Sequence, residues 1–328
     1  MRILVTGPSG FIGKRSVERL AADPSLQIIA ASRGKYSFFQ ANVRNKEYVE
    51  LSADADSDEI LTGVEGVIHL AARVHVMHDT EVDPLTAFRA VNVDGTLSLA
   101  RQAAVAGVKR FVFVSSVKVN GESTQPGRTF TEADPPNPQD AYGQSKHEAE
   151  QGLRQLSADT GMEVVIIRPP LVYGPGVKAN FAALMRAVQR GWPLPLGAVH
   201  NQRSLVALDN LVDFIVTCIT HPQAANQTFL VSDGQDLSTT ELVRGMALAA
   251  GVPARLLPVP VWALQAGASL LGKGNAVQRL CGNLQVDISK ARSLLGWVPP
   301  VSVEKGLRRA MGGVRDLGMD SCLRRNDG

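Results

Sequence analysis

The sequence predicts an α/β fold, a doubly wound parallel sheet with helices on both faces and a smaller second domain. Apolar strand-like segments alternate with helical segments through the first half of the chain, which is typical of parallel strands joined by helices. These strands are continuously apolar rather than alternating, so we expect both faces of the sheet to be buried. The chain has 328 residues, 45% of them hydrophobic, and single cores rarely grow beyond about 250–300 residues.

The opening of the chain has the order strand, turn, helix, strand. We expect the first strand at residues 2–5, the turn at 6–13, the helix at 14–22 and the second strand at 26–31. The alternation then continues in three apolar strands at 66–70, 110–114 and 164–167, with helical stretches at 84–106 and 141–160.

The first turn carries three glycines, Gly7, Gly10 and Gly13, spaced GxxGxxG directly after the first strand. In such a turn one glycine permits a tight bend, another lets the backbone approach a pyrophosphate, and the third lets helix and strand pack closely. The helix N-terminus adds amide donors and the positive end of a dipole. We therefore predict a Rossmann-type domain that binds NAD or NADP, with Phe11 and Ile12 in the same loop.

The end of the second strand bears on the choice between the two cofactors. An acid about twenty residues after the loop normally binds the adenosine ribose when the cofactor is NAD. Here the strand ends in Ser32 and Arg33 without an acid. Arg33 and Ser32 together favour the 2′-phosphate of NADP, and a solvated loop charge is the alternative for Arg33, so NAD and NADP both stay open.

A serine, a tyrosine and a lysine form the candidate proton-transfer site. Tyr142 and Lys146 are four residues apart in a helical stretch, so their side chains share one face. A nearby ammonium lowers the pKa of a phenol, before any opposing desolvation. Ser115 and Ser116 directly follow an apolar strand, at the edge where ligands bind in doubly wound folds. We expect these groups to act together on a substrate alcohol or carbonyl.

In chain order, the motifs resemble those of extended short-chain dehydrogenases/reductases of the nucleotide-sugar epimerase and dehydratase family. The matching motifs include TGxxGFIG, HLAA, NVxGT, YxxxK and a late Asp-x-x-Lys-Ala-x-x-x-Leu-Gly-Trp, and they span residues 1–312. Within the family the chain is most similar to UDP-hexose or UDP-N-acetylhexosamine 4-epimerases and to related C4 reductases. The resemblance implies a homodimer, paired through two helices of the first domain.

The resemblance also implies roles for individual residues. Ser116 matches the catalytic hydroxyl, Tyr142 the acid and base, and Lys146 the lysine that binds the nicotinamide ribose and tunes the tyrosine. Further residues on the cofactor side are Leu70, Ala71, Ala72 and Asn92, and His69 belongs to the architecture of the same site. On the substrate side, Asn180, Arg203 and Arg279 match residues that contact the nucleotide diphosphate, and planar cationic donors suit that group.

Departures from the family pattern reduce the number of activities that we expect. Val117 and Lys118 stand where 4,6-dehydratases carry an acidic pair, which argues against water elimination. Asn120 and Leu171 replace a usual tyrosine and a substrate-contacting asparagine, so the sugar stays open.

We expect a 4-epimerase that acts on a UDP-sugar by transient oxidation at C4. The alternatives are an NADPH-dependent C4 reductase of a UDP-4-keto-6-deoxy sugar, which Arg33 and Lys118 favour, a non-catalytic dinucleotide sensor, and a steroid or flavonoid carbonyl reductase. Because Tyr142 and Lys146 are both present, the sensor is disfavoured. Diphosphate contacts at Asn180 and Arg203 argue against the carbonyl reductase.

The expected domain division follows a change in composition and in the length of the predicted elements. We expect a dinucleotide-binding domain at 1–172, with returning segments near 205–222, and a substrate-binding domain at 173–312, because prolines separate shorter elements after Arg168. Residues 313–328 lack periodicity and are expected to be a disordered tail. The apolar stretch at 259–271 is expected to form a buried helix of the second domain, with a partner-binding or membrane-surface helix as the alternatives.

Composition sets the remaining expectations. Lys and Arg number 34 against 31 Asp and Glu, a formal charge of +3, so we expect no nucleic-acid partner. Three scattered cysteines predict neither a disulfide framework nor a zinc site, which fits the cytoplasm. No signal pattern and no apolar run long enough to span a bilayer is present, so we expect no membrane partner. His75 and His78 lack a third ligand, and no metal is expected.

Overall fold

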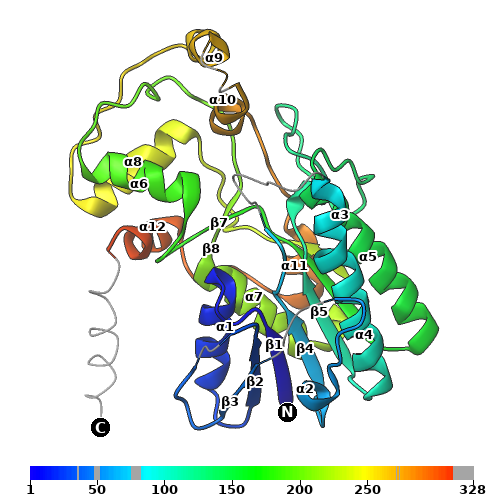
Figure 1. Cartoon of the computed structure of the whole chain (residues 1–328). Helices are drawn as coiled ribbons and strands as arrows, with labels where there is room; N and C mark the ends of the chain where they lie inside the picture. The colour runs from blue at the N-terminus through cyan, green and yellow to red at the C-terminus, as the bar shows by residue number, and fades with distance from the viewer. Residues whose placement is uncertain (35–36, 48–51, 75–82, 271, 273, 313–328) are drawn as a thin grey trace, which may run out of the picture.

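We describe a computed structural model of the chain at residues 1–34, 37–47, 52–74, 83–270, 272 and 274–312. Its centre is a seven-stranded parallel sheet in the order β3-β2-β1-β4-β5-β6-β9 (Figure 1). The strands are β1 (Arg2–Thr6), β2 (Gln27–Ser32), β3 (Val43–Glu47), β4 (Gly66–His69), β5 (Arg110–Val114), β6 (Glu163–Arg168) and β9 (Thr228–Leu230).

Helices cover both faces of this sheet. One face carries α1 (Phe11–Ala21), α7 (Leu208–Thr220) and α11 (Ser289–Leu295), whose apolar side chains share one buried cluster with alternate strand residues. The other face carries α2 (Asp58–Leu61), α4 (Thr96–Val105) and α5 (Ala141–Thr160), packed in a second cluster. The predicted doubly wound α/β fold is confirmed.

The order of the strands places a crevice beside β1. The chain passes from β1 to β2 and β3 on one side, and then crosses to β4 and β5 on the other. Ligands bind at such a switch point, outside the carboxyl ends of the strands. Because β1 and β4 pair in parallel with Thr6 opposite His69, the loops that follow these two strands face each other there.

The long helix α5 begins and ends at clear signals. The Asp140 side chain caps its N-terminus by accepting a hydrogen bond from the amide of Gly143, and Gly161 ends it with a left-handed φ of 76°. The predicted helical stretch at 84–106 is divided instead, into α3 (Pro84–Arg89), a π-helical turn (Ala90–Gly95) and α4.

A second group of elements packs on the carboxyl side of the sheet (Figure 1). It contains a third apolar cluster and the two-stranded parallel sheet of β7 (Leu171–Tyr173) and β8 (Leu205–Ala207). Its helices are α6 (Ala179–Gln189), α8 (Thr239–Ala250), α9 (Val261–Leu270), α10 (Gly274–Cys281) and α12 (Val303–Gly312). The division into 1–172 and 173–312 stays a prediction, and β9 and α11 also return to the main sheet, beyond the segment at 205–222.

Helix α9 differs from its expectation. The stretch 259–271 was expected to form a buried helix, but Trp262 is 72% exposed and Leu270 is 89% exposed. Only Ala268 of this helix is buried. The expectation was wrong because an apolar composition shows that a helix is favoured away from water. It does not show whether other elements of the fold cover every face of that helix. Across the described ranges, no helix combines the length and hydropathy that crossing a bilayer needs.

Candidate active site

The glycine loop is built so that side chains would not fit. Gly7 has a φ of 67°, and a Cβ on it would lie 2.8 Å from the amide nitrogen of Ala71 in the turn after β4. A Cβ on Gly13 would lie 2.0 Å from the carbonyl oxygen of Gly7. Gly10 is the N-cap of α1, and no side chain caps this helix. The free amide end of α1 therefore suits the pyrophosphate of a dinucleotide.

The two residues at the end of β2 have different surroundings. The Ser32 hydroxyl is buried and donates a hydrogen bond to the carbonyl oxygen of Gly34 at 2.8 Å. Arg33 is exposed beside it. The serine thus shapes the turn after the strand, and the arginine is the cation at this position.

His69 is a buried structural link at the end of β4. Its Nδ1 lies 2.8 Å from the Thr6 hydroxyl and its Nε2 lies 3.0 Å from the Thr96 hydroxyl. Burial, and then the charge of Lys146, lower the pKa of His69 to about 3. A neutral ring that joins β1, β4 and α4 agrees with the expected architectural role.

The neutral state of His69 predicts acid sensitivity. The folded pKa of about 3 lies below the ordinary value of 6.5, so between these values the unfolded chain binds a proton that the folded chain does not. This group therefore lowers the free energy of unfolding by about 1.4 kcal/mol for each pH unit of acidification inside that window. In urea unfolding between pH 7 and 4, His69→Gln is expected to show a shallower pH dependence than the wild type. The exposed His200, changed to Gln, is the matched control, and parallel curves for wild type and His69→Gln would contradict the prediction.

Asn92 ties the loop after β4 to α5. Its Oδ1 accepts a hydrogen bond from the amide of Arg73 at 2.8 Å, and its Nδ2 donates to the Arg73 carbonyl and to the Ser145 hydroxyl, both at 3.0 Å. The side chain is buried. Asn92 therefore holds the segment that contains Leu70, Ala71 and Ala72 against the helix that carries Tyr142.

Lys146 lies buried beneath Tyr142 on the same face of α5. Its Nζ donates a hydrogen bond to the carbonyl oxygen of Val114 at 3.0 Å and lies 4.4 Å from the centre of the Phe113 ring. The distance from Nζ to the centre of the Tyr142 ring is 5.9 Å. Burial lowers the pKa of Lys146 to about 7, against the opposing charge of Glu150. The lysine can thus change protonation state near neutral pH.

The pKa of Tyr142 departs from the sequence-based argument. Desolvation, followed by the charge of Asp140, raises this pKa above its ordinary value, whereas we expected Lys146 to lower it. The argument underestimated desolvation, which disfavours the phenolate, and it assumed an ammonium that the same burial leaves only partly charged at neutral pH. In this structure, burial therefore favours the phenol of Tyr142 over the phenolate that takes a proton from a substrate.

The two consecutive serines after β5 have separate tasks. Ser115 is buried and donates its hydroxyl proton to Oε1 of Glu150 at 2.6 Å. Ser116 is partly exposed and caps the short 3₁₀ turn η2 (Val117–Val119), where its hydroxyl accepts from the amide of Lys118 at 3.2 Å. Because η2 packs against α5, Ser116 lies on the side of the sheet where that helix begins.

Lys118 joins η2 to the first turn of α5. Its Nζ donates to Oε1 of Glu122 at 2.9 Å and forms an ion pair with Asp140, the N-cap of α5. A Cβ on Gly143 would lie 3.0 Å from the Lys118 carbonyl oxygen, so the turn and the helix are in close contact. Lys118 thus has a structural explanation that needs no substrate.

Below this site lies a buried ion pair that the sequence reasoning missed. Arg168 donates to both carboxylate oxygens of Glu150, at 2.9 and 2.6 Å, and to Oδ1 of Asn120 at 3.0 Å. Burial opposes ionisation of Glu150, but the hydrogen bonds and charge of Arg168 outweigh it and lower the pKa of this carboxyl. Asn120 therefore acts in the protein framework. The available signal was Glu150 itself, a carboxylate one helical turn after Lys146.

The candidate diphosphate residues lie in the second group of elements. Arg203 donates to the Gly282 carbonyl at 3.0 Å, and burial and then the charge of Arg279 lower its pKa. The structure therefore brings Arg203 close to Arg279, on α10. Asn180 is exposed in the first turn of α6.

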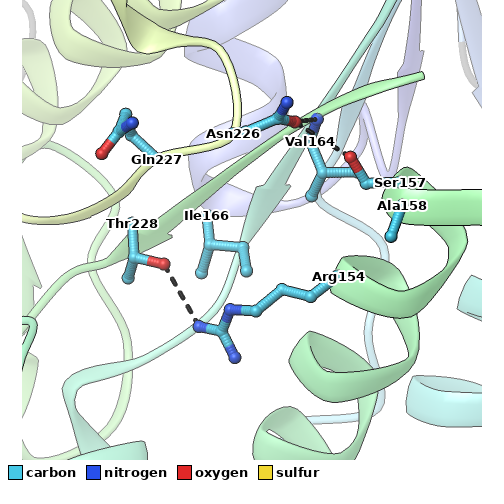
Figure 2. A pocket seen from close by; sticks show the side chains of 8 residues that line it. All are labelled: Arg154, Ser157, Ala158, Val164, Ile166, Asn226, Gln227 and Thr228. Atoms are coloured by element: carbon cyan, nitrogen blue, oxygen red, sulfur yellow. Dashed lines mark hydrogen bonds between the residues drawn. The ribbon is translucent and has the colours of Figure 1, made fainter. Parts of the chain in front are cut away.

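A hollow at the far end of α5 lies away from these residues. Figure 2 shows hydrogen bonds among several residues that line it: Arg154 donates to the Thr228 hydroxyl at 3.1 Å, and Asn226 Oδ1 accepts from the Ser157 hydroxyl and the Val164 backbone amide, both at 2.9 Å. Tyr142 occupies the first turn of this helix and Ser157 one of its last, so the hollow is separate from the candidate site.

His75 and His78 fall outside the described residues. Over the residues that are described, no three His, Cys, Asp or Glu side chains gather in a way that would hold a metal ion.

Comparisons with known proteins agree with this arrangement. The chain is 50% identical over 308 residues to a UDP-glucose 4-epimerase of Vibrio cholerae, covering 94% of this chain and 93% of that protein. It is 28% identical over 329 residues to the N-acetyl-alpha-D-glucosaminyl-diphospho-ditrans,octacis-undecaprenol 4-epimerase of Escherichia coli O157:H7, covering 94% of each. The fold matches that of a UDP-glucose 4-epimerase from Thermotoga maritima with a TM-score of 0.74 and 24% identity, over 95% of this chain and 98% of that one.

The family is identified by a match that extends over most of the chain. The model described as the NAD dependent epimerase/dehydratase family matches residues 3–232. This region contains the glycine loop, Ser116, Tyr142 and Lys146. The chain belongs to the NAD-dependent epimerase/dehydratase family.

Proposed function

We propose that this chain is an NAD-dependent 4-epimerase of UDP-sugars that works by transient oxidation at C4. The observation that carries the proposal is the placement of Tyr142 above the buried Lys146 on α5, next to the turn that Ser116 begins. The 50% identical relative named as a UDP-glucose 4-epimerase supports UDP-glucose and its C4 epimer as the substrate pair.

The proposed chemistry assigns one proton and one hydride. The Ser116 hydroxyl binds the C4 hydroxyl of the sugar. Tyr142, in its phenolate form, takes the proton of that hydroxyl and later returns it to the C4 oxygen. NAD, when bound, would supply the acceptor for the C4 hydride, which would return to the opposite face of C4 after the 4-keto sugar has turned. Lys146 holds the nicotinamide ribose and tunes the pKa of Tyr142.

The cofactor site follows from the loops around the crevice. Its proposed residues surround the carboxyl ends of β1, β2 and β4 and the start of α5: Gly7, Gly10, Phe11, Ile12, Gly13, Ser32, Arg33, Leu70, Ala71, Ala72, Asn92, Tyr142 and Lys146. The family match supports NAD. The Ser32 hydroxyl, already bonded to Gly34, is not available for a 2′-phosphate without rearrangement, which supports the same choice.

We place the substrate diphosphate against the second group of elements. Burial, and then the charge of Arg279, lower the pKa of Arg203. An anion bound between the two arginines would relieve the repulsion between them. Asn180 completes this set in the proposal. A tightly held diphosphate and a loosely held sugar allow the 4-keto sugar to turn within the site.

The direct test is incubation of the purified protein with UDP-glucose and a catalytic amount of NAD. We expect conversion to UDP-galactose, followed by NMR of the sugar signals, with no net absorbance change at 340 nm because the hydride returns to the sugar. Turnover that requires stoichiometric NADPH would instead indicate the C4 reductase. Of the two residues that favoured that reductase, Lys118 already pairs with Glu122 and Asp140, so the epimerase is the better-supported function.

We also propose a cytoplasmic homodimer with a cofactor domain at 1–172, to which segments near 205–222 return, and a substrate domain at 173–312. Helices α4 and α5 pack side by side on one face of the sheet. They could supply the two helices through which, by the resemblance, two copies of the chain pair. Light scattering of the purified protein tests the dimer.

A further inference from the structure

Helix α9 has no partner for most of its surface. Val261 and Leu264 pack against the third apolar cluster, whereas Trp262 and Leu270 are 72% and 89% exposed. A helix that packs on one neighbour needs only one apolar stripe. Apart from Gln265 and Ser269, every residue of α9 is apolar or glycine, so the exposed side of the helix is also apolar.

The sequence around α9 continues this pattern. Residues 256–272 contain no charged residue, and Arg255 and Lys273 flank them. A run of this length is too short to span a bilayer, for which about 20 residues are needed. Arginine and lysine side chains next to an apolar segment are long enough to reach the headgroups of a bilayer while the apolar side chains enter it.

A neighbouring loop extends the exposed apolar surface. The amide of Leu194 donates to the Arg255 carbonyl and the amide of Leu257 donates to the Leu194 carbonyl, both at 2.8 Å, so the segment that leads to α9 lies beside residues 192–197. Trp192 and Leu257 are each about half exposed on these segments. The Arg190 guanidinium lies 5.4 Å from the centre of a Trp192 ring. An aromatic ring and a cation thus lie next to the apolar segment.

The charge of this part of the chain is of one sign. Residues 169–208 and residues 242–286 each contain four Lys or Arg and no Asp or Glu. These segments include α6, α9 and α10, and Figure 1 places α9 and α10 at the end of the molecule opposite the N-terminus. The chain as a whole has a formal charge of only +3, so the rest of it is net acidic and the cationic charge is concentrated here.

We propose that this surface docks on a bilayer that contains anionic lipid headgroups. We call it the apolar pole and define it by Trp192, Leu257, Trp262 and Leu270, with Arg190 and Arg255 beside them. In the docked state, the apolar and aromatic side chains enter the interface and the arginines contact phosphate groups. The sequence-based expectation of no membrane partner is revised for this surface, although the chain does not span the membrane.

The charges favour lipid over a second copy of the chain. Two copies that met through the apolar pole would bring cationic surfaces together, because neither segment supplies an acidic residue for pairing. An anionic bilayer offers both the apolar layer and the opposite charge. The inference does not depend on the proposed reaction, since no residue of the apolar pole belongs to the candidate active site.

The test is sedimentation of the full chain with vesicles of phosphatidylcholine alone or mixed with phosphatidylglycerol. We expect binding to the mixed vesicles that weakens as salt is added, and much less binding to phosphatidylcholine alone. Two of the three tryptophans lie in the apolar pole, and the third, Trp297, is buried. A blue shift of tryptophan emission on mixed vesicles therefore gives a second readout.

Paired variants separate the apolar and charged contributions. Trp262→Ser with Leu270→Ser is expected to lower the partition coefficient about tenfold or more, because two exposed apolar side chains lose their burial in lipid. Arg190→Glu with Arg255→Glu is expected to lower binding to the mixed vesicles by a similar factor. Val298→Ser, at a site that is 66% exposed after α11, is the matched control and leaves binding unchanged.

Two outcomes would overturn the proposal. One is wild-type protein that stays in the supernatant with mixed vesicles at low salt. The other is a change of oligomeric state, measured by light scattering, in Trp262→Ser with Leu270→Ser while vesicle binding stays the same, since that assigns the surface to a second copy. Epimerase activity on UDP-glucose in the absence of vesicles is measured in parallel, so that loss of docking and loss of catalysis are distinguished.

Discussion

Tyr142→Phe is expected to keep the fold and lower kcat by about 10²–10⁴-fold, the usual contribution of a positioned acid or base. The variant removes one hydroxyl and leaves the ring, whose centre lies 6.1 Å from that of Phe88 in an edge contact. With the phenol absent, no group at this position of α5 can take or return the C4 proton. NAD binding, measured by calorimetry, should weaken only slightly, because Lys146 and the glycine loop are untouched.

The control makes the same chemical change elsewhere. Tyr173→Phe likewise removes one phenol hydroxyl, which donates to Oδ2 of Asp233 at 2.7 Å. Tyr173 lies on β7 and has no part in the proposed reaction. We expect this variant to be less stable, with the turnover number of its folded fraction close to that of the wild type. Wild-type turnover in Tyr142→Phe would contradict the assignment of the acid and base.

Arg168→Met is expected to lower the free energy of unfolding by about 3–5 kcal/mol, the typical effect of removing one partner of a buried ion pair. Arg168 is 2% exposed and the Glu150 side chain 0%, so the variant leaves a carboxylate buried without its main partner. Urea unfolding followed by circular dichroism measures the change. Adding Glu150→Gln to this variant should recover part of the loss, since no unpaired buried charge then remains.

The control uses the other arginine that contacts the same carboxylate. Arg154 pairs with Oε2 of Glu150 at 2.9 Å, but its side chain is 44% exposed, so Arg154→Met should cost about 1 kcal/mol or less. Equal losses in Arg154→Met and Arg168→Met would show that burial does not set the strength of this network.

The central sheet was accessible to prediction because its strands are apolar on both faces and long enough to recognise. β4 and β5 lie in the apolar segments where strands were predicted. In contrast, β3 has the sequence VRNKE and is the edge strand of the sheet. Most of its side chains are exposed, so no apolar pattern marks it as a strand. β9 has three residues, and its place beside β6 depends on contacts that only the folded chain makes.

The residues of the candidate site likewise divide into those that local sequence predicts and those that it does not. Gly7, Tyr142 and Lys146 were found because turn geometry and helical periodicity act over a few residues. Arg168 and Glu150 lie on separate elements and meet only when β6 packs beside α5, so no local spacing signals their pairing. The expected direction of the Tyr142 pKa shift was wrong for a related reason. Desolvation depends on every neighbour of the phenol and not on one lysine four residues away.

The repeated return of the chain to the main sheet has a consequence for how the molecule can be divided. The elements α7, β9 and α11 all come after residue 172, yet they supply much of the apolar cluster on one face of the sheet. A fragment that ended at 172 would leave Val17 and Leu20 of α1 without that cover. The two regions therefore share one apolar cluster, and we expect them to unfold together and neither to be exchangeable as an independent module.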